Sequence, residues 1–343
     1  MNIDKSKINK ILCIKLRGIG DVILSTVVFD NLRNEFPQAK IDYLTEPPGK
    51  AALEKLSFLN EIILYKKNES FGGLKTIAKV FFNNYDLVLD FYSNPRTAMI
   101  TFFSHAKYRA GFPYRGRTYA YNLYGPDERD KFHAAQLHLE YLIKIGIEVN
   151  SSNLHFGLDE KDISFADNFY KNNFSKNDFV VVLSPSGGWE SKKCDASKFA
   201  EIAEAVRQKY HSKFLILWGP DDYDDAAAIK KELKDAAILA PDTTIREGAA
   251  LMKLAKMVIA NDSGPMHIST AVGTPTLSIH GPTNPNLQGP FGEKHASIRL
   301  EELDCIGCNL LKCPRKHECF LDLPIIKVMD KVDQLIVKNK ITF

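Results

Sequence analysis

Two segments of this chain repeat one arrangement: an apolar run, a polar turn containing glycine, and a stretch that favours a helix. In the second segment, the apolar run 257–260 leads through the turn 261–264 to Pro265, and Gly273 follows the helix-favouring stretch. An apolar run of this length is typical of a parallel strand that is buried on both faces. Proline suits the first turn of a helix, and glycine suits the residue after its end. Repeated strand–turn–helix units restrict a chain to α/β folds built on parallel sheets.

The helix predicted to begin after this turn offers a binding site for an anion. The free N–H groups and the positive dipole end of its first turn point beyond the end of the preceding strand. Asp262 and Ser263 lie beside the helix start and suit a phosphate-bearing polyol. Any parallel α/β protein also contains a capped helix of this kind, so this segment alone favours a binding site and a structural cap equally.

The first segment lies near the N-terminus, where we predict a strand over 10–17, a turn over 18–21 and a helix over 22–33. It is not a dinucleotide-binding fingerprint, because Ile23 stands where a third glycine is needed. The chain also lacks the P-loop sequence of nucleotide triphosphatases. Taken alone, Asp21 is interpreted as the N-cap of the predicted helix.

Length and composition narrow the remaining classes. With 343 residues, the chain exceeds what one core usually organises, so we expect two domains. Its net charge of +3 is too small to argue for nucleic acid. The chain has no apolar stretch of about 20 residues and begins with a polar segment, so we predict neither a transmembrane helix nor a secretory signal. We expect a cytoplasmic protein.

Strand-like and helix-like segments alternate along the chain in two series of similar size, separated by the polar stretch 173–178, which suits a linker. We therefore predict an α/β protein of two Rossmann-like doubly wound domains, 1–172 and 179–322, that face a central cleft. Asp21 and Asp262 both follow predicted strands. This placement favours a binding role for both residues over a capping role.

Several of these segments together resemble glycosyltransferase family 9, the heptosyltransferases of lipopolysaccharide core assembly. The match runs in order over nearly the whole chain, and its main segments are 18–26, 261–267, 273–275 and 280–285. The resemblance implies the GT-B architecture, with an acceptor held by the first domain and a nucleotide sugar, ADP-heptose, held by the second. It implies inversion at the anomeric carbon with no required metal or cofactor. It also implies that the C-terminal helix, in 323–343, packs back on the first domain.

The resemblance assigns roles to particular residues. Asp21 matches the proposed base that takes the proton of the acceptor hydroxyl. Lys192 matches a lysine that meets the charge of the leaving nucleoside diphosphate, and Lys193 is the neighbouring alternative. Asp262 would orient the donor sugar, and His267 faces either the ligand or the core. The other residues expected to bind the donor are Ser186, Gly187, Asp222, Asp224, Ser263 and Gly264, and those expected to bind the acceptor are Gly18, Gly20, Arg109, Arg115 and Arg117.

The segment Asp222-Tyr-Asp224 matches the Asp-x-Asp pattern by which many glycosyltransferases hold a divalent ion. It lies between an apolar strand and an alanine-rich helix, where acidic residues in the first helical turn are favourable without any ligand. We therefore predict no catalytic metal. By the resemblance, this loop meets the nucleoside, with Asp222 or Asp224 binding the ribose.

The region 96–117 carries lysine, arginine and aromatic residues but no aspartate or glutamate. Such a region suits an anionic lipid-linked acceptor and the anionic surface of the inner membrane, to which the protein would bind peripherally. A solvated face over buried aromatic side chains is the alternative, and we favour the acceptor. No recognised nucleic-acid motif accompanies it, so we predict no nucleic-acid partner.

Four of the six cysteines cluster late in the chain. Their spacing permits a structural zinc site but lacks paired Cys-x-x-Cys knuckles, and a cytoplasmic location argues against disulfides. The four are Cys305, Cys308, Cys313 and Cys319.

Three other classes of protein would share the predicted fold. A nucleotide-sugar epimerase would convert the donor without an acceptor. A non-catalytic nucleotide-sugar-binding protein would share the cleft, and an inactive family member would bind the donor and leave it intact.

Overall fold

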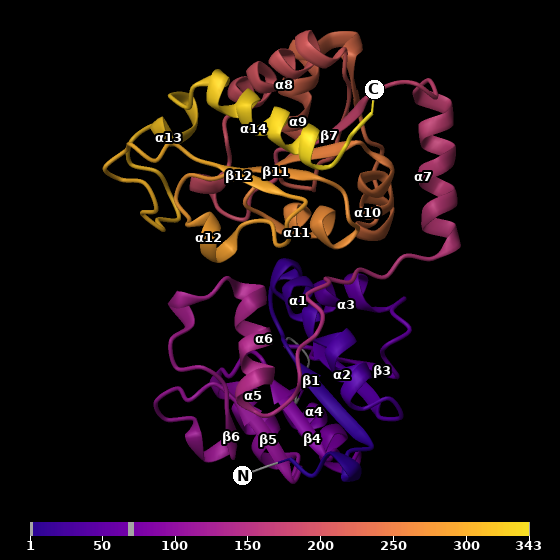
Figure 1. Ribbon diagram of the computed structural model, residues 1–343, viewed down its shortest axis with the longest axis vertical. Helices are drawn as coiled ribbons and strands as arrows, with labels where there is room; N and C mark the ends of the chain where they lie inside the picture. Colours follow the sequence, from indigo (N-terminus) through magenta and orange to yellow (C-terminus); the bar gives the residue numbers. More distant parts are fainter. Residues whose placement is uncertain (1–2, 68–71, 343) are drawn as a thin grey trace. The chain divides into compact units, whose positions relative to one another are not determined.

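The computed structural model describes residues 3–67 and 72–342, and the chain divides into two compact units, Met1–Gly157 and Leu158–Phe343 (Figure 1). The predicted boundary at 173–178 lies later than the observed one. The difference arises because helix α7 (Glu160–Asn173) packs against α10 (Ile245–Leu254) of the second unit. The Tyr170 hydroxyl donates a hydrogen bond to the Leu251 carbonyl oxygen at 3.0 Å, which ties the two helices together.

Within the described residues, the first unit contains a parallel six-stranded sheet in the order β3-β2-β1-β4-β5-β6. This order is that of a Rossmann fold, in which the chain direction across the sheet reverses between the first and fourth strands. The strands are β1 (Lys10–Ile14), β2 (Lys40–Thr45), β3 (Glu61–Leu64), β4 (Leu87–Asp90), β5 (Tyr108–Gly111) and β6 (Leu123–Tyr124). The helices are α1 (Ile19–Ser25), α2 (Phe29–Glu35), α3 (Pro47–Leu53), α4 (Gly72–Phe82), α5 (Pro95–Phe103) and α6 (Ala134–Lys144).

The helix predicted over 22–33 is broken into α1, a 3-10 turn at Thr26–Val28 and α2. The Ser25 hydroxyl donates to the Val22 carbonyl oxygen at 2.7 Å, and the Thr26 hydroxyl donates to the Ile23 carbonyl oxygen at 2.6 Å. Hydroxyl groups that bond nearby carbonyls in this way compete with the regular helical pattern and bend helices. The break was therefore encoded in two small polar residues.

The second unit repeats the same strand order, here written β12-β11-β10-β7-β8-β9, and its described strands are also parallel. The prediction of two Rossmann-like sheets is confirmed. The strands are β7 (Val180–Ser184), β8 (Lys213–Ile216), β9 (Ala237–Leu239), β10 (Met257–Asn261), β11 (Thr276–Ile279) and β12 (Ala296–Ile298). The remaining helices are α8 (Ala196–Tyr210), α9 (Tyr223–Leu233), α11 (Gly264–Ala271), α12 (Pro285–Gln288), α13 (Glu318–Leu321) and α14 (Ile325–Lys338).

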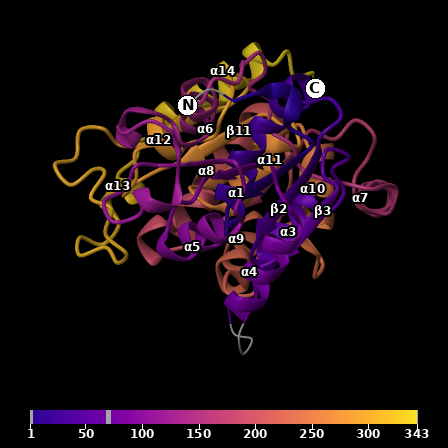
Figure 2. The same ribbon diagram turned by 90° about the horizontal axis from the view of Figure 1, so that it is seen from below.

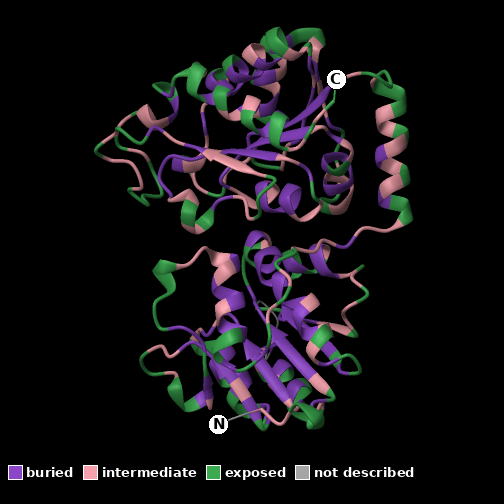
Figure 3. Cartoon of the chain, in the orientation of Figure 1, coloured by how far each residue is buried: buried purple, intermediate pink, exposed green. Residues whose placement is uncertain are grey.

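The core of each unit lies along its sheet, where the inner strands are buried almost throughout and the edge strands are partly exposed (Figure 3). Helix α14 contributes Val328, Val332 and Leu335 to the core of the second unit and packs against α8, β11 and β12. The C-terminal segment, predicted to pack back on the first domain, is thus part of the second unit. Among the described residues, no helix is long and apolar enough to cross a membrane.

Candidate active site

Each sheet has one place where ligands bind in Rossmann-like folds: the carboxyl ends of the two strands between which the strand order reverses. In the first unit these strands are β1 and β4, and in the second they are β7 and β10. Asp21 lies in the first turn of the helix that follows β1. Lys192 follows β7, and Asp262 follows β10. The two units therefore place these three predicted residues at the expected edge of each sheet.

The turn before α1 depends on Gly18. This residue adopts φ +74°, in the left-handed region that favours glycine, and a Cβ atom there would lie 3.0 Å from Oδ2 of Asp21. Gly18 is also the N-cap of α1, and Asp21 is the third residue of the helix. The interpretation of Asp21 as the N-cap is therefore wrong. Its carboxylate is half exposed, so it is accessible to a ligand.

Lys15 is a partner of Asp21 that the sequence analysis missed. Its side chain is only 5% exposed, and its ammonium nitrogen lies 3.8 Å from Oδ1 of Asp21. The same nitrogen lies 5.4 Å from the centre of the Tyr92 ring. Burial lowers the pKa of Lys15, and the charges of Asp21 and Asp90 oppose this effect. The signal in the sequence was a lysine directly after an otherwise apolar strand.

Asp90, at the end of β4, organises the turn beside Lys15. It is fully buried and accepts hydrogen bonds from the N–H groups of Tyr92 (3.0 Å) and Ser93 (2.8 Å) and from the Tyr121 hydroxyl (2.8 Å). Burial raises the pKa of Asp90, although these hydrogen bonds act in the opposite direction. Asp90 therefore fixes the backbone of Tyr92, whose ring lies beside Lys15. Sequence analysis also missed Asp90.

The three arginines predicted to bind the acceptor lie in different surroundings. Arg109 donates to the carbonyl oxygens of Ala120 (3.0 Å) and Ala106 (2.7 Å), so its guanidinium holds two loops together. Arg117 donates to the Ser93 carbonyl oxygen at 3.1 Å and thus lies at the turn after β4. Arg115 is exposed. Of the three arginines, Arg109 therefore has a structural role within the first unit.

An ion pair joins the two loops at the reversal point of the second unit. The Lys192 ammonium lies 2.7 Å from Oδ2 of Asp262, and the two side chains are only 12% and 5% exposed. The ammonium also lies 4.4 Å from the centre of the Trp189 ring. Because β7 and β10 are neighbours in the sheet, residues 70 positions apart in sequence meet at one edge.

A chain of hydrogen bonds through Thr283, His280 and Ser278 holds the Asp262 carboxylate in place. The Thr283 hydroxyl donates to Oδ2 of Asp262 at 2.6 Å, and His280 lies 3.2 Å from that hydroxyl and 2.8 Å from the Ser278 hydroxyl. Burial lowers the pKa of His280 to about 4, so the ring is neutral at pH 7. Burial would raise the pKa of Asp262, but His280, Lys192 and Thr283 together lower it. Sequence analysis quoted the segment 280–285 for the resemblance without assigning this role.

Asn261 fixes the loop that carries Ser186 and Gly187. Its side-chain amide donates to the Pro185 carbonyl oxygen at 2.7 Å, and its side-chain oxygen accepts from the Cys194 N–H at 3.3 Å. A Cβ atom at Gly187 would lie 2.6 Å from Cγ of Lys193, so a larger residue there would displace the Lys193 side chain. The loop is thus held close to the start of α11.

The first turn of α11 keeps N–H groups available for an anion. Ser263 is its N-cap, in an extended conformation, and among the described residues its side chain makes no capping hydrogen bond. Gly264 and Pro265 begin the helix, and Gly273 follows its end with φ +85°, as predicted. His267 is buried, with 8% of its surface exposed. Helix starts of this kind bind phosphate groups.

Lys193 is engaged differently from Lys192. Its ammonium lies 2.6 Å from Oδ1 of Asp222 and 3.3 Å from Oδ2 of Asp225. Burial would lower the pKa of Lys193, but the two aspartates raise it. Asp224 is exposed in the first turn of α9, where acidic residues are favourable. The structure thus ties Lys193 to the acidic loop and Lys192 to Asp262.

The four clustered cysteines line one small pocket together with Gly281, and all are free thiols. The N–H groups of Arg315 and His317 donate to the Cys313 sulfur at 3.4 and 3.3 Å. Burial, followed by the neighbouring thiols, raises the pKa of Cys319 to about 12. Over residues 3–67 and 72–342, no group of three or more His, Cys, Asp or Glu side chains is arranged to hold a metal ion.

Comparison with known proteins identifies the family of this chain. The family model for glycosyltransferase family 9 (heptosyltransferase) matches residues 74–317. Lipopolysaccharide heptosyltransferase 3 of Escherichia coli (strain K12) is 24% identical, over 95% of this chain and 96% of that protein.

Two solved structures share the fold over nearly their whole length. The glycosyl transferase family 9 protein of Veillonella parvula DSM 2008 has a TM-score of 0.84 at 22% identity, covering 96% of this chain and 97% of that chain. The E. coli ADP-heptose lps heptosyltransferase II has a TM-score of 0.78 at 19% identity, covering 96% of this chain and 99% of that chain. Because the family model matches well over half of the sequence, this chain belongs to glycosyltransferase family 9, the heptosyltransferase family.

Proposed function

We propose that this protein transfers a heptose from ADP-heptose to a lipopolysaccharide-core or other lipid-linked saccharide. Membership of the family supports this function, as do the names of similar proteins, lipopolysaccharide heptosyltransferase 3 and ADP-heptose lps heptosyltransferase II. The observation that carries the proposal is the buried Lys192–Asp262 pair, which lies at the start of α11. It provides a cation, a carboxylate and a helix N-terminus in one place.

The second unit would bind the donor. Negative charge builds on the diphosphate as its bond to the sugar breaks, and a fixed cation with oriented N–H groups stabilises that charge. Lys192 and the first turn of α11 provide both. Asp262, which is ionised at neutral pH because its pKa is lowered, would accept hydrogen bonds from the sugar hydroxyls. The loop residues Ser186, Gly187, Ser263 and Gly264 lie at the same edge of the sheet and would complete the diphosphate site.

The first unit would bind the acceptor and supply the base. In an inverting transfer, the acceptor oxygen attacks the anomeric carbon, the bond to the diphosphate breaks, and the acceptor proton passes to the base. Asp21 is the accessible carboxylate at the reversal point of this sheet. The buried Lys15 ammonium would hold that carboxylate in place. Gly18 leaves room beside this carboxylate, Gly20 lies buried in the same turn of α1, and Arg115 and Arg117 would meet anionic groups of the acceptor.

We propose further that the transfer requires no metal ion. Lys192 and the helix N-terminus supply the positive charge that a divalent cation provides in other glycosyltransferases. Asp222 is held by Lys193, which leaves the Asp-x-Asp segment explained by its place at the start of α9. Any zinc bound by the cysteines would then serve folding. A lipid-linked acceptor would place the protein in the cytoplasm, at the inner membrane surface.

The decisive experiment incubates the purified protein with ADP-heptose and with a panel of other nucleotide heptoses, with and without core-saccharide acceptors. We expect ADP release and a glycosylated acceptor only when donor and acceptor are both present, and NMR of the product should show an inverted anomeric configuration. Conversion of the donor without acceptor would indicate an epimerase instead. Donor binding without any conversion would indicate a binding protein or an inactive family member.

A further inference from the structure

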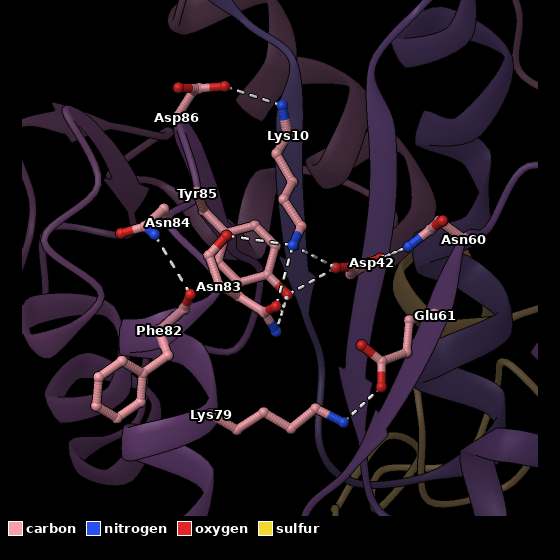
Figure 4. A network of polar contacts seen from close by, with 10 residues as sticks. All are labelled: Lys10, Asp42, Asn60, Glu61, Lys79, Phe82, Asn83, Asn84, Tyr85 and Asp86. Atoms are coloured by element: carbon pink, nitrogen blue, oxygen red, sulfur yellow. Dashed lines mark hydrogen bonds and ion pairs between the residues drawn. The ribbon is translucent and has the colours of Figure 1, made fainter.

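The first unit exposes large apolar side chains on two neighbouring helices. Helices α4 and α5 pack against each other, and Figure 2 shows α4 at the rim of the unit. Phe82 is 76% exposed, and in Figure 4 its ring points away from the polar network around Lys10 and Asp42. We call this surface the aromatic face. Its members are Leu74, Phe81, Phe82, Met99, Phe102, Phe103 and Tyr119.

Ring contacts group the aromatic members of this face into two clusters, one on α4 and one on α5, and these two helices pack against each other. The Phe81 ring lies 5.2 Å from the Phe82 ring and 5.4 Å from His105, which follows α5. The Phe102 ring lies 5.3 Å from Phe103 and 5.6 Å from Tyr119. Exposed aromatic side chains that gather in this way mark interaction surfaces, because soluble proteins rarely leave large apolar patches uncovered.

The charged side chains on the two helices of this surface are all basic. Helices α4 and α5 carry Lys75, Lys79 and Arg96 and contain no acidic residue. Beside them, Lys66, Lys75 and Lys79 line one groove of about 150 Å³. Lys79 forms an ion pair with Glu61 of β3, so an acidic side chain also lies beside this groove. A surface of this composition complements an anionic partner.

We propose that the aromatic face and its lysine groove dock the protein on an anionic phospholipid membrane. Aromatic rings favour the headgroup boundary of a bilayer, and lysines near it attract anionic headgroups. The region 96–117, which sequence analysis singled out, contributes through α5. Its later part does not, because Tyr108 and Phe112 are buried and Arg109 braces two loops. The inference extends the proposed function, whose acceptor is lipid-linked, and its test requires no transfer reaction.

The test measures binding of the full-length protein to vesicles by co-sedimentation. We expect binding to phosphatidylethanolamine–phosphatidylglycerol vesicles and little binding to phosphatidylcholine vesicles. The double variant Phe82→Ser/Phe103→Ser should weaken vesicle binding by about tenfold or more, because two rings no longer enter the boundary. The matched control is Val337→Ser, which removes an exposed apolar side chain from α14 in the other unit and should bind like the wild type. Circular dichroism checks that each variant folds.

A charge reversal tests the groove separately. Lys75→Glu should weaken binding to the anionic vesicles roughly 20-fold, since it replaces one attraction with one repulsion. The control reversal, Lys231→Glu on α9, should leave it unchanged. The proposal would be overturned if the wild-type protein did not bind anionic vesicles, or if the variants bound them as well as the wild type does. Loss of self-association in the Phe variant, without loss of vesicle binding, would assign the face to a second copy of this chain. Transfer to a delipidated acceptor should be unaffected by either face variant, which separates this proposal from the proposed function.

Discussion

Replacing Lys192 by methionine should cost both stability and nucleotide affinity. The ammonium and the Asp262 carboxylate are 2.7 Å apart and nearly buried, so their attraction is about 6 kcal/mol at an effective dielectric constant of about 20. Part of this attraction offsets the cost of removing both charges from water. Removing one partner of such a pair leaves a buried charge uncompensated and typically costs about 3–5 kcal/mol. In a domain of this size, that loss lowers Tm by roughly 10 °C.

The loss should depend on pH in a defined direction. The pKa of Asp262 is lowered by folding from its ordinary value of 3.8, so its contribution to stability is present above that pH and disappears as pH falls through the folded-state pKa. Removing Lys192 takes away one of the groups that lower the pKa of Asp262, so this pKa should be higher in the variant than in the wild type. The stability difference between Lys192→Met and the wild type should therefore be largest at neutral pH and shrink below about pH 4.

Thermal and denaturant unfolding of the variant, measured at several pH values, provides the assay. The double variant Lys192→Met/Asp262→Asn should recover most of the lost stability, because neither buried charge remains, but it should not recover ADP affinity. We expect ADP to bind the single variant about 10- to 100-fold more weakly, the range for a lost charge-assisted hydrogen bond. This account of the pair would be refuted if the Lys192→Met protein were as stable as the wild type at neutral pH and the second substitution added no stability.

Three further outcomes test the proposed chemistry. Asp21→Asn should keep its affinity for the donor and lower turnover by about 100-fold or more, and turnover near the wild-type rate would remove Asp21 from the mechanism. Lys193→Ala should leave ADP affinity close to that of the wild type and increase hydrogen exchange in the loop 221–225. If Lys193→Ala weakened ADP binding and Lys192→Ala did not, Lys193 rather than Lys192 would be the residue that contacts the diphosphate. Transfer should persist in excess EDTA, whereas a prompt loss reversed by Mg²⁺ or Mn²⁺ would return Asp222 and Asp224 to the centre of the site.

The sequence by itself determined the fold class and the place of the site. Apolar runs, turn residues and helix periodicity are local signals, and they were sufficient to locate most strands and to put Asp21 and Asp262 after two of them. The alternation of strands and helices then implied Rossmann-like sheets, because parallel strands require helical crossovers. Local signals were too weak for β5, β6 and β12, none of which contains three consecutive apolar residues, and sequence analysis did not predict them.

Contacts between distant residues could be decided only by the tertiary structure. Lys192 and Lys193 are adjacent in sequence, yet one pairs with Asp262 and the other with Asp222, because different neighbouring strands deliver the two carboxylates. Similarly, Phe103 is exposed and Phe112 is buried, although both belong to one aromatic region. Burial and charge pairing depend on which elements cover a residue, and that covering is set by long-range packing rather than by the residue's own neighbours in the chain.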